Sequence, residues 1–172
     1  MNFIYTLAFI KQGNKILMIN RNKQPWQGMW NGVGGKINQN ETPLECVVRE
    51  IYEETNLKFN KDEVIYKGKV TWNNAFYPNG KGIDYNEGLY LYFVNLNEDI
   101  LYETPILTDE GILAWKDISF LKDKDNLGIA YNIPYFIDNL LNNQNEYEYR
   151  CLFEGNNLKK VAIRKIIWKS FY

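Results

Sequence analysis

Residues 35–57 read GKINQNETPLECVVREIYEETNL, and this stretch decides how the rest of the chain is interpreted. Thr42 is a good N-cap, Pro43 suits the first helical position, and the glutamate three residues after the cap completes a capping box. Asn56 stands where helices commonly end in a left-handed residue, a place that asparagine tolerates almost as well as glycine. The stretch therefore predicts a helix over residues 43–55.

This helix has an apolar side and an acidic side. At about 100° per residue, its apolar residues fall together: Leu44, Val47, Val48, Ile51 and Thr55. Glu50, Glu53 and Glu54 gather opposite them. Three carboxylates on adjacent turns repel one another, so their pKa values should be raised unless a cation neutralises them.

Hard oxygen ligands in such a cluster suit Mg²⁺ or Mn²⁺. The alternative interpretation is a solvated acidic helix face, which is the commoner meaning of clustered glutamates. Two details favour the metal site here. A glycine-rich segment runs directly into the helix, and Arg49 interrupts the acidic run.

The composition excludes several kinds of chemistry. The chain has 172 residues and no histidine, which rules out Ser-His-Asp and Cys-His catalysis and zinc sites that use histidine. Acid–base chemistry must then come from Glu, Asp, Lys, Tyr, Cys or metal-bound water. The length and a hydrophobic content of 45% fit a single domain over residues 1–172.

The charge and cysteine content point to a cytoplasmic protein. The net charge is −1, so we expect neither general nucleic-acid binding nor membrane adhesion. Residues 1–10 lack the basic start and cleavage site of a signal peptide. Cys46 and Cys151 are isolated thiols that suit a reducing compartment, and Cys46 is best interpreted as a small filler residue.

Strand and helix patterns alternate along the chain. Strands are predicted at residues 2–10, 15–20, 63–72, 88–96, 111–116, 147–154 and 158–168, and a short glycine-rich strand or loop at residues 30–37. A second helix is predicted over residues 133–141, and loops or turns over 21–29, 73–86, 99–109 and 117–121. A mixed sheet with two helices, an α/β fold, is the natural assembly.

The spacing in residues 35–57 is nearly that of the Nudix box: Gly, five residues, Glu, seven residues, Arg-Glu, an aliphatic, any residue, Glu-Glu, any residue, Gly, an aliphatic. Asn56 stands in place of the second glycine. The chain thus resembles the Nudix hydrolases, and residues 30–36 resemble the MutT-type enzymes that act on oxidised nucleotides. The resemblance implies an α/β/α sandwich and metal-dependent hydrolysis of a nucleoside diphosphate linked to another group.

The same resemblance assigns roles within the box. Glu50, Glu53 and Glu54 would bind the metal, with the carbonyl of Gly35 as a further ligand. Arg49 would hold the glutamates by charge-assisted hydrogen bonds. Glu50 is the first candidate to activate water.

Other roles lie around the box. The resemblance implies that Glu41 orients Arg49 or the loop, that Lys36 faces the phosphates, and that Asn31 reads a base edge. Arg21, at the end of the second strand, could meet phosphate, as could its neighbour Lys23. Residues 108–115 match a segment in which many Nudix enzymes carry an acid before a tryptophan. Glu110 is therefore a candidate metal ligand or base, with a solvated loop acid as the alternative.

One segment departs from the oxidised-nucleotide enzymes. Residues 125–132 lack the tryptophan and paired acids that grip an oxidised purine there, although three of them could supply hydrogen bonds: Asp125, Asn126 and Asn132. Four aromatic residues could stack on a base or simply pack in the core: Trp26, Trp30, Phe76 and Tyr77.

The sequence thus predicts hydrolysis of a nucleoside triphosphate, using Mg²⁺ or Mn²⁺, to a nucleoside monophosphate and pyrophosphate. ADP-ribose, another nucleotide sugar or a capped RNA end are alternative substrates, for which residues 73–86 or a dimer would extend the cleft. A sensor that binds nucleotide without turnover and a structural interaction module are rivals of another class. Both a monomer and a homodimer are compatible with the sequence.

Overall fold

The computed structural model describes residues 3–73, 85 and 87–167. Its strands are β1 (Tyr5–Gln12), β2 (Lys15–Arg21), β3 (Trp30–Asn31), β4 (Ile65–Trp72), β5 (Glu87–Asn95), β6 (Ile106–Thr108), β7 (Gly111–Asp117), β8 (Tyr147–Glu154) and β9 (Asn157–Lys165). Its helices are α1 (Pro43–Thr55), α2 (Ile118–Lys122) and α3 (Ile133–Asn142). The proposed stacking residues Phe76 and Tyr77 lie outside the described residues, as does most of the connection 73–86.

The described strands form one mixed sheet in the order β6-β7-β2-β1-β5-β4-β8-β9, with β3 paired to β2. β1 runs parallel to β5 and β4 runs parallel to β8, whereas the other neighbours are antiparallel. Parallel neighbours need long crossover connections. The chain passes through α1 on its way from β1 to β5, and through α3 on its way from β4 to β8.

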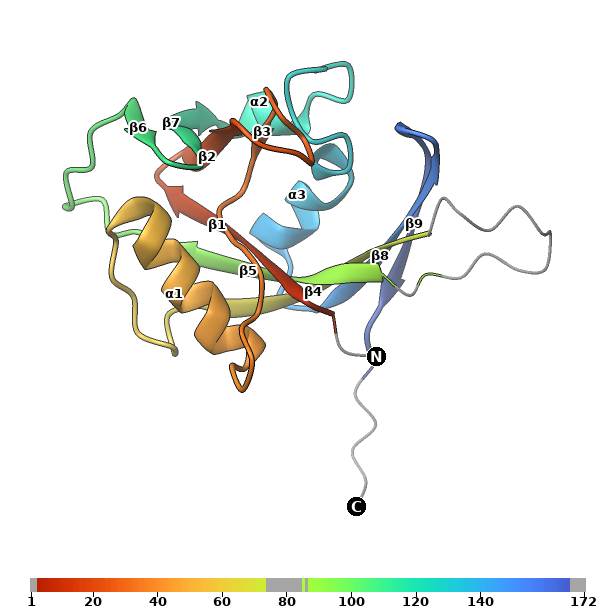
Figure 1. The fold of residues 1–172 in the computed structure, drawn as a ribbon, viewed down its shortest axis with the longest axis horizontal. Coiled ribbons are helices and arrows are strands. Elements are labelled where there is room, and N and C mark those ends of the chain that lie inside the picture. Colours follow the sequence, from red (N-terminus) through yellow and green to blue (C-terminus); the bar gives the residue numbers. More distant parts are fainter. Residues whose placement is uncertain (1–2, 74–84, 86, 168–172) are drawn as a thin grey trace.

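Helices cover both faces of this sheet (Figure 1). Side chains alternate along β1, as they must in a strand. Ala8 and Ile10 belong to the apolar core that α1 shares, whereas Leu7 and Phe9 belong to the core that α3 shares. The expected α/β/α sandwich with a mixed sheet is confirmed.

Helix α1 begins and ends as its sequence predicts. The Thr42 hydroxyl accepts the backbone N–H of Glu45 at 3.2 Å, and the Glu45 carboxylate accepts the backbone N–H of Thr42 at 3.0 Å. Asn56 closes the helix at φ 58°, with its N–H donating to the carbonyl of Tyr52. Asparagine therefore replaces the glycine of the box without disturbing the helix end.

The position of Glu54 differs from the prediction that it lies opposite the apolar residues of α1. Its side chain is buried, with 9% of the residue exposed, instead of facing away from the apolar side. Glu54 is seven residues after the buried Val47, which places the two only about 20° apart around the helix. The acidic cluster therefore reaches into the apolar face.

Two other predictions were wrong in detail. The predicted loop 99–109 contains β6, which forms a tight hairpin with β7. The predicted turn at 117–121 is the short helix α2, which buries Leu121 against the core. Residues 30–37, predicted as a short strand or loop, contain β3, after which the backbone makes single bridges to β1 at Val33 and Lys36.

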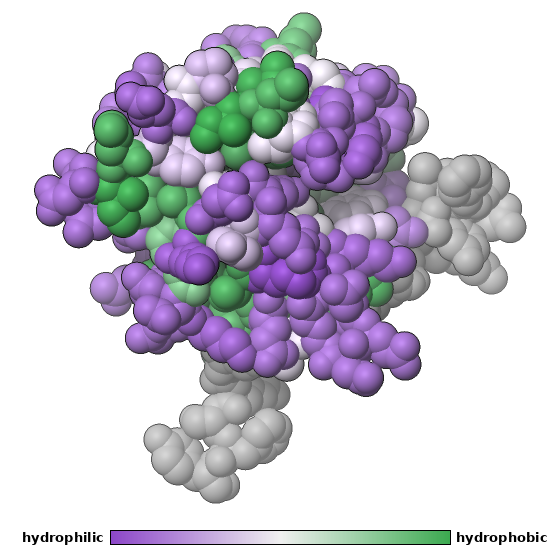
Figure 2. All heavy atoms as spheres, turned by 60° about the vertical axis from the view of Figure 1, so that its left-hand side comes forward, coloured by the Kyte–Doolittle hydropathy of each residue, from purple (hydrophilic) through white to green (hydrophobic). Residues whose placement is uncertain are grey.

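The surface is mainly hydrophilic on the face seen in Figure 2, with apolar side chains in separate patches. Among the described residues, strongly exposed apolar side chains such as Leu101, Leu107 and Leu127 come from different segments. Scattered apolar residues of this kind are normal on a protein surface. None of the helices in the described part of the chain is long and apolar enough to cross a membrane.

Candidate functional site

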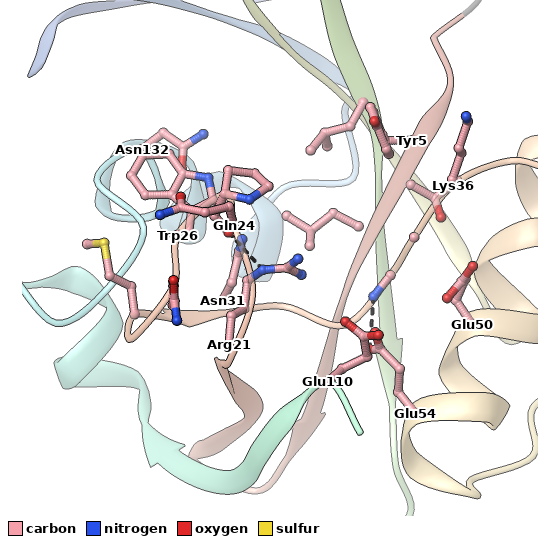
Figure 3. Close-up of a pocket in the computed structure, with 18 of the residues that line it drawn as sticks. Tyr5, Arg21, Gln24, Trp26, Asn31, Lys36, Glu50, Glu54, Glu110 and Asn132 are labelled. Atoms are coloured by element: carbon pink, nitrogen blue, oxygen red, sulfur yellow. Dashed lines mark hydrogen bonds between the residues drawn. The ribbon is translucent and has the colours of Figure 1, made fainter. Parts of the chain in front are cut away.

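A cleft of about 1130 Å³ is lined by residues from nearly every part of the chain. Figure 3 shows glutamates on the α1 side of this cleft and Trp26, Gln24 and Asn132 on the opposite side. We name the two parts by the residues that line them. The acidic end is Glu50, Glu53, Glu54 and Glu110. The aromatic end is Gln24, Trp26, Tyr131, Asn132 and Phe153.

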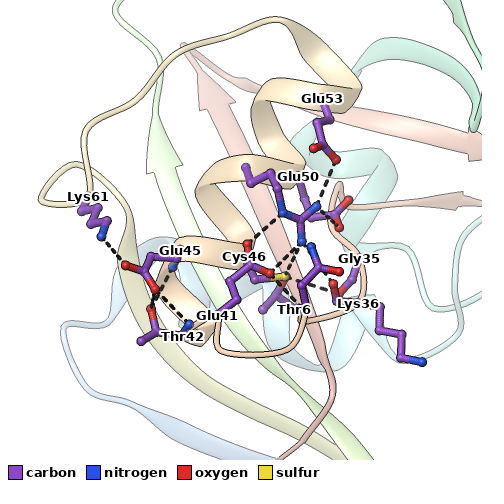
Figure 4. Close-up of polar contacts among 12 residues, drawn as sticks. Thr6, Gly35, Lys36, Glu41, Thr42, Glu45, Cys46, Glu50, Glu53 and Lys61 are labelled. Atoms are coloured by element: carbon purple, nitrogen blue, oxygen red, sulfur yellow. Dashed lines mark hydrogen bonds and ion pairs between the residues drawn. The ribbon is translucent and has the colours of Figure 1, made fainter.

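Figure 4 shows Glu50 and Glu53 on α1 and Glu41 in the loop before it. Arg49 connects these three acids through ion pairs. Its Nε and Nη2 each donate to one oxygen of Glu41 at 2.8 Å, in a two-pronged ion pair. Its Nη1 donates to Glu50 at 2.7 Å and to Glu53 at 3.0 Å. The guanidinium holds the pKa of Glu41 down to about 2. Arg49 thus makes the contacts expected of a residue that positions the glutamates, and Glu41 in turn orients Arg49.

Two carboxylates at this end are withdrawn from water. Glu50 lies so close to the backbone of Gly35 that a Cβ there would collide with its carboxylate. Burial raises the pKa of Glu50, against the opposing effect of Arg49. Glu54 accepts the N–H of Gly34 at 3.2 Å, and burial raises its pKa to about 8, with a further contribution from the charge of Glu50.

Cys46 lies beneath these acids as a packing residue. Its side chain is fully buried, and its Sγ lies 3.4 Å from the hydroxyl of Thr6. Burial raises the pKa of the thiol to about 11. A thiol of this kind is inert, in keeping with a filler residue.

Among the described residues, no three Asp, Glu, Cys or His side chains already surround a common point as a metal site. The carboxylates of Glu50 and Glu53 do not converge with that of Glu54, because both pair with the guanidinium of Arg49. Glu54 is turned toward the backbone at Gly34.

The donors nevertheless fit a hard divalent cation. A buried carboxylate with a raised pKa is a group whose charged form a cation would stabilise, and Glu50 and Glu54 both have this character. The carbonyl of Gly35 accepts the N–H of Thr6 at 2.9 Å and a weak contact from the Cys46 thiol at 3.9 Å. The ligand assignments themselves stay predictions.

Glu110 and Arg21 face α1 across the cleft. Glu110 lies in the turn between β6 and β7 and accepts Lys23 Nζ at 2.7 Å. It is close enough to Glu54 to raise the pKa of that carboxyl, whereas the charge of Arg21 lowers it. Arg21 ends β2, and its Nε donates to the carbonyl of Pro25.

Lys36 and Lys23 differ in their relation to the cleft. Both side chains are exposed, but Lys36 belongs to the cleft lining and Lys23 does not. Lys23 instead pairs with Glu110. Of the two lysines, Lys36 is therefore the better placed to meet a phosphate.

Three residues expected near the base do line the cleft: Asn31, Trp26 and Asn132. The Oδ1 of the buried Asn31 accepts the N–H of Gly32 at 2.9 Å, which fixes the orientation of the side-chain amide. Trp26 packs edge-to-face on Tyr131, with ring centroids 5.2 Å apart. These residues combine flat apolar faces with neutral hydrogen-bonding groups.

Three other candidates lie away from the cleft. Trp30 is covered by Lys116, whose Nζ is 3.8 Å from the ring centroid. The side-chain amide of Asn126 bonds two backbone groups, the carbonyl of Phe120 in α2 and the N–H of Gly128. Asp125 is exposed in the loop after α2. None of the three belongs to the cleft lining, and a contact of Asn126 or Asp125 with a base stays a prediction that this lining does not support.

Sequence reasoning missed several lining residues. They are Tyr5, Gln24, Gln27, Trp72, Tyr131, Phe153 and Asn156. The two strands that form the hairpin carrying Phe153 were predicted. No local pattern indicates that the turn between them folds back over a cleft formed by residues more than a hundred positions earlier.

Solved structures share this architecture. A MutT protein from Bacillus halodurans superposes with a TM-score of 0.66 at 21% identity, covering 92% of this chain and 95% of that one. A mixed sheet between helices, with an acidic helix beside a cleft, therefore defines a fold of the MutT class. At this identity the likeness concerns the fold alone.

The sequence comparisons identify the family. The NUDIX domain model matches residues 2–125, and the chain belongs to this family. An ADP-ribose pyrophosphatase of Methanocaldococcus jannaschii is 48% identical over 50 residues, which are 29% of this chain and 30% of that protein. The oxidized purine nucleoside triphosphate hydrolase of Mus musculus is 35% identical over 54 residues, 31% of this chain and 35% of that enzyme. The matched stretches thus span about a third of these relatives' lengths.

Proposed function

We propose that this chain hydrolyses nucleoside triphosphates to a nucleoside monophosphate and pyrophosphate, with Mg²⁺ or Mn²⁺ as the cofactor. One observation carries the proposal. The acidic residues of α1 and the aromatic and amide residues on the opposite side line the same cleft. A cleft that offers carboxylates at one end and flat neutral groups at the other suits a ligand with a polyphosphate and a base.

Glu50, Glu53 and Glu54 would hold the metal, with the carbonyl of Gly35 as a further ligand. A bound divalent cation would neutralise the polyphosphate and lower the pKa of a water molecule. Arg49 forms ion pairs with two of the glutamates, Glu50 and Glu53. This pairing supports a role for Arg49 as a positioning residue.

Glu50 and Glu110 are the two candidates for the base that takes a proton from water. Burial raises the pKa of Glu50, and a raised pKa makes a carboxylate a stronger base. Glu110 stands on the opposite side, near Glu54. Arg21 and Lys36 supply positive charge at the cleft lining for the phosphates.

ADP-ribose or another nucleotide linked to a second group is the alternative substrate. The cleft volume is about 1130 Å³, slightly larger than that of ordinary ligand sites, which measure roughly 300–1000 Å³. A larger substrate would use that space. A sensor without turnover is the weaker rival, because this chain keeps all three box glutamates.

A panel of nucleotides tests the proposal. Nucleoside triphosphates, ADP-ribose, a nucleotide sugar and a capped RNA end are incubated with Mg²⁺, and pyrophosphate and phosphate are measured separately. Pyrophosphate release from a triphosphate supports the proposal. Turnover of ADP-ribose alone would replace it with the alternative, and nucleotide binding without any turnover would favour the sensor.

A further inference from the structure

The β8–β9 hairpin contributes to the cleft although it lies outside the family match. The NUDIX model ends at residue 125, and the hairpin begins at Tyr147. Its tip, residues 153–156, supplies Phe153, Gly155 and Asn156 to the cleft lining. This chain therefore adds a wall to the cleft from a part of the sequence that the family does not define.

The backbone of Phe153 is held in place by the side chain of Asn73. Asn73 follows directly after β4, and its Nδ2 donates to the carbonyl of Phe153 at 2.9 Å. Its Oδ1 accepts the N–H of the same residue at 2.7 Å. The two bonds continue the β4–β8 pairing, whose last register pair is Trp72 with Cys151. The tip is thus fixed to the sheet and not merely resting on it.

Phe153 joins a group of aromatic rings at this end. Its ring centroid lies 6.2 Å from that of Trp26, with the two ring planes tilted by 55°. Trp26 itself is held at φ 66°, a conformation that large side chains rarely adopt. A backbone held in this way aims the indole toward one place.

The polar groups around these rings are mostly neutral amides. Gln24, Gln27, Asn132 and Asn156 all belong to the lining. Amides offer both donors and acceptors without net charge, which suits the edge of a heterocyclic base better than a phosphate. Flat apolar rings beside them suit its face.

We propose that Phe153 is a specificity-determining residue, which contacts the base of a nucleotide bound in the cleft, and that Asn73 positions it. The inference rests on the proposed function for the presence of a nucleotide. It adds the residue and the chain segment that recognise the base. The occupant of the aromatic end is therefore a planar neutral heterocycle, and the polyphosphate extends from it toward α1.

The test compares Phe153→Leu with two controls. Phe153→Tyr keeps the ring, and Phe120→Leu makes the same chemical change on α2, against the same core but outside the cleft lining. Equilibrium dissociation constants are measured for GMP, a probe with a base and a single phosphate, without metal. KM and kcat are measured for the best triphosphate of the panel.

Phe153→Leu should weaken GMP binding and raise KM by at least about fivefold, with kcat changed by less than about twofold. The two controls should stay within about twofold of the wild type. Equal GMP affinity in Phe153→Leu and the wild type, or no saturable binding of GMP to the wild type, would overturn the inference. Loss of turnover across the whole panel would instead remove the proposed function, and the GMP affinities would still decide the role of Phe153.

A second measurement needs no variant, in case Phe153→Leu does not fold. GMP is titrated into the wild-type protein, and amide chemical shifts are followed by NMR. The amides of Phe153 and Asn156 should shift more than that of Arg164, which lies at the other end of the same hairpin. Shifts at the glutamates of α1 without any at the hairpin tip would contradict the inference.

Discussion

The two ends of the cleft are built in different ways. Three of the four acids at the acidic end, together with Arg49 and Gly35, come from one stretch of 23 residues, positions 35–57. The aromatic end is assembled from the loop after β2, the segment before α3 and the tip of the β8–β9 hairpin. The groups proposed for chemistry are thus encoded locally, whereas the groups proposed for recognition depend on how distant segments pack. If so, changes at the acidic end should act on kcat and changes at the aromatic end on KM.

Of the changes considered, Glu53→Gln is expected to have the largest effect, and this effect should fall on kcat. Glu53 is 55% exposed at its side chain and contacts Arg49, so the change should leave the fold intact. Loss of one metal ligand should lower kcat by at least about a hundredfold. Steady-state kinetics at fixed Mg²⁺ measure it, with Glu98→Gln, an exposed residue outside the cleft lining, as the matched control. Near wild-type kcat at low Mg²⁺ would remove Glu53 from the metal site.

The burial of Glu54 should make the metal-free protein less stable as pH rises. Its pKa is about 8 in the folded chain, against an ordinary value of 4.5, so the folded state holds the proton more tightly than the unfolded state. The resulting stabilisation is complete below pH 4.5 and is lost as pH rises through 8. Between about pH 6.5 and 8.5 the free energy of unfolding should fall by about 2 kcal/mol.

Urea unfolding in excess chelator at the two pH values measures this change. Glu54→Gln carries no titrating proton at this position, so its stability should be much less dependent on pH over the same interval. If the free energy of unfolding of the wild type depended on pH as little as that of the variant, Glu54 would be ionised in the folded protein at no cost in free energy. Its raised pKa would then be no argument for a cation.

Glu110→Gln tests the part of the acidic end that lies outside α1. If Glu110 binds a metal or activates water, kcat should fall at least about tenfold, which corresponds to about 1.4 kcal/mol in the barrier. The ion pair with Lys23 is largely exposed, so its loss should cost little stability. A kcat within about twofold of the wild type would return Glu110 to a solvated loop acid whose main contact is Lys23.

The smallest effect is expected in the choice between oxidised and normal purines. The cleft lining offers neutral amides such as Asn31 and Asn132 to the base edge, but residues 125–132 lack the paired acids of the oxidised-nucleotide enzymes. Stacking alone discriminates poorly between related bases, so the preference for 8-oxo-dGTP over dGTP should be modest, about tenfold or less. Ratios of kcat/KM for both, and for a pyrimidine triphosphate, measure it. A preference of roughly a thousandfold would mean that the aromatic end reads the base through hydrogen bonds not identified here.

The local features of the fold were predictable from the sequence. The capping box at Thr42, the left-handed end at Asn56 and the apolar side of α1 all follow from short-range patterns. The contact between Arg49 and Glu41 was expected from the resemblance to the Nudix box. The burial of Glu54 was missed, although its place seven residues after Val47 puts it near the apolar side. The hydrogen bond that it accepts from the N–H of Gly34 depends on a separate segment approaching α1.

The aromatic end was only partly predictable, for a physical reason. Trp30 and Trp26 are only four residues apart, but Trp30 packs beneath Lys116 while Trp26 lines the cleft. Composition cannot distinguish the two, since both are large aromatic residues near glycine. Phe153 was missed because its place depends on β8 pairing with β4, a contact across about eighty residues that Asn73 completes.

Turnover of a nucleoside triphosphate in excess chelator, followed by addition of Mg²⁺ or Mn²⁺, tests the central claim most directly. The acidic end cannot accept a polyphosphate without cations to offset the repulsion between carboxylates and phosphates. The account predicts no pyrophosphate release in chelator and full recovery once either cation exceeds it. Undiminished pyrophosphate release in excess chelator would contradict the assignment of the α1 glutamates as metal ligands.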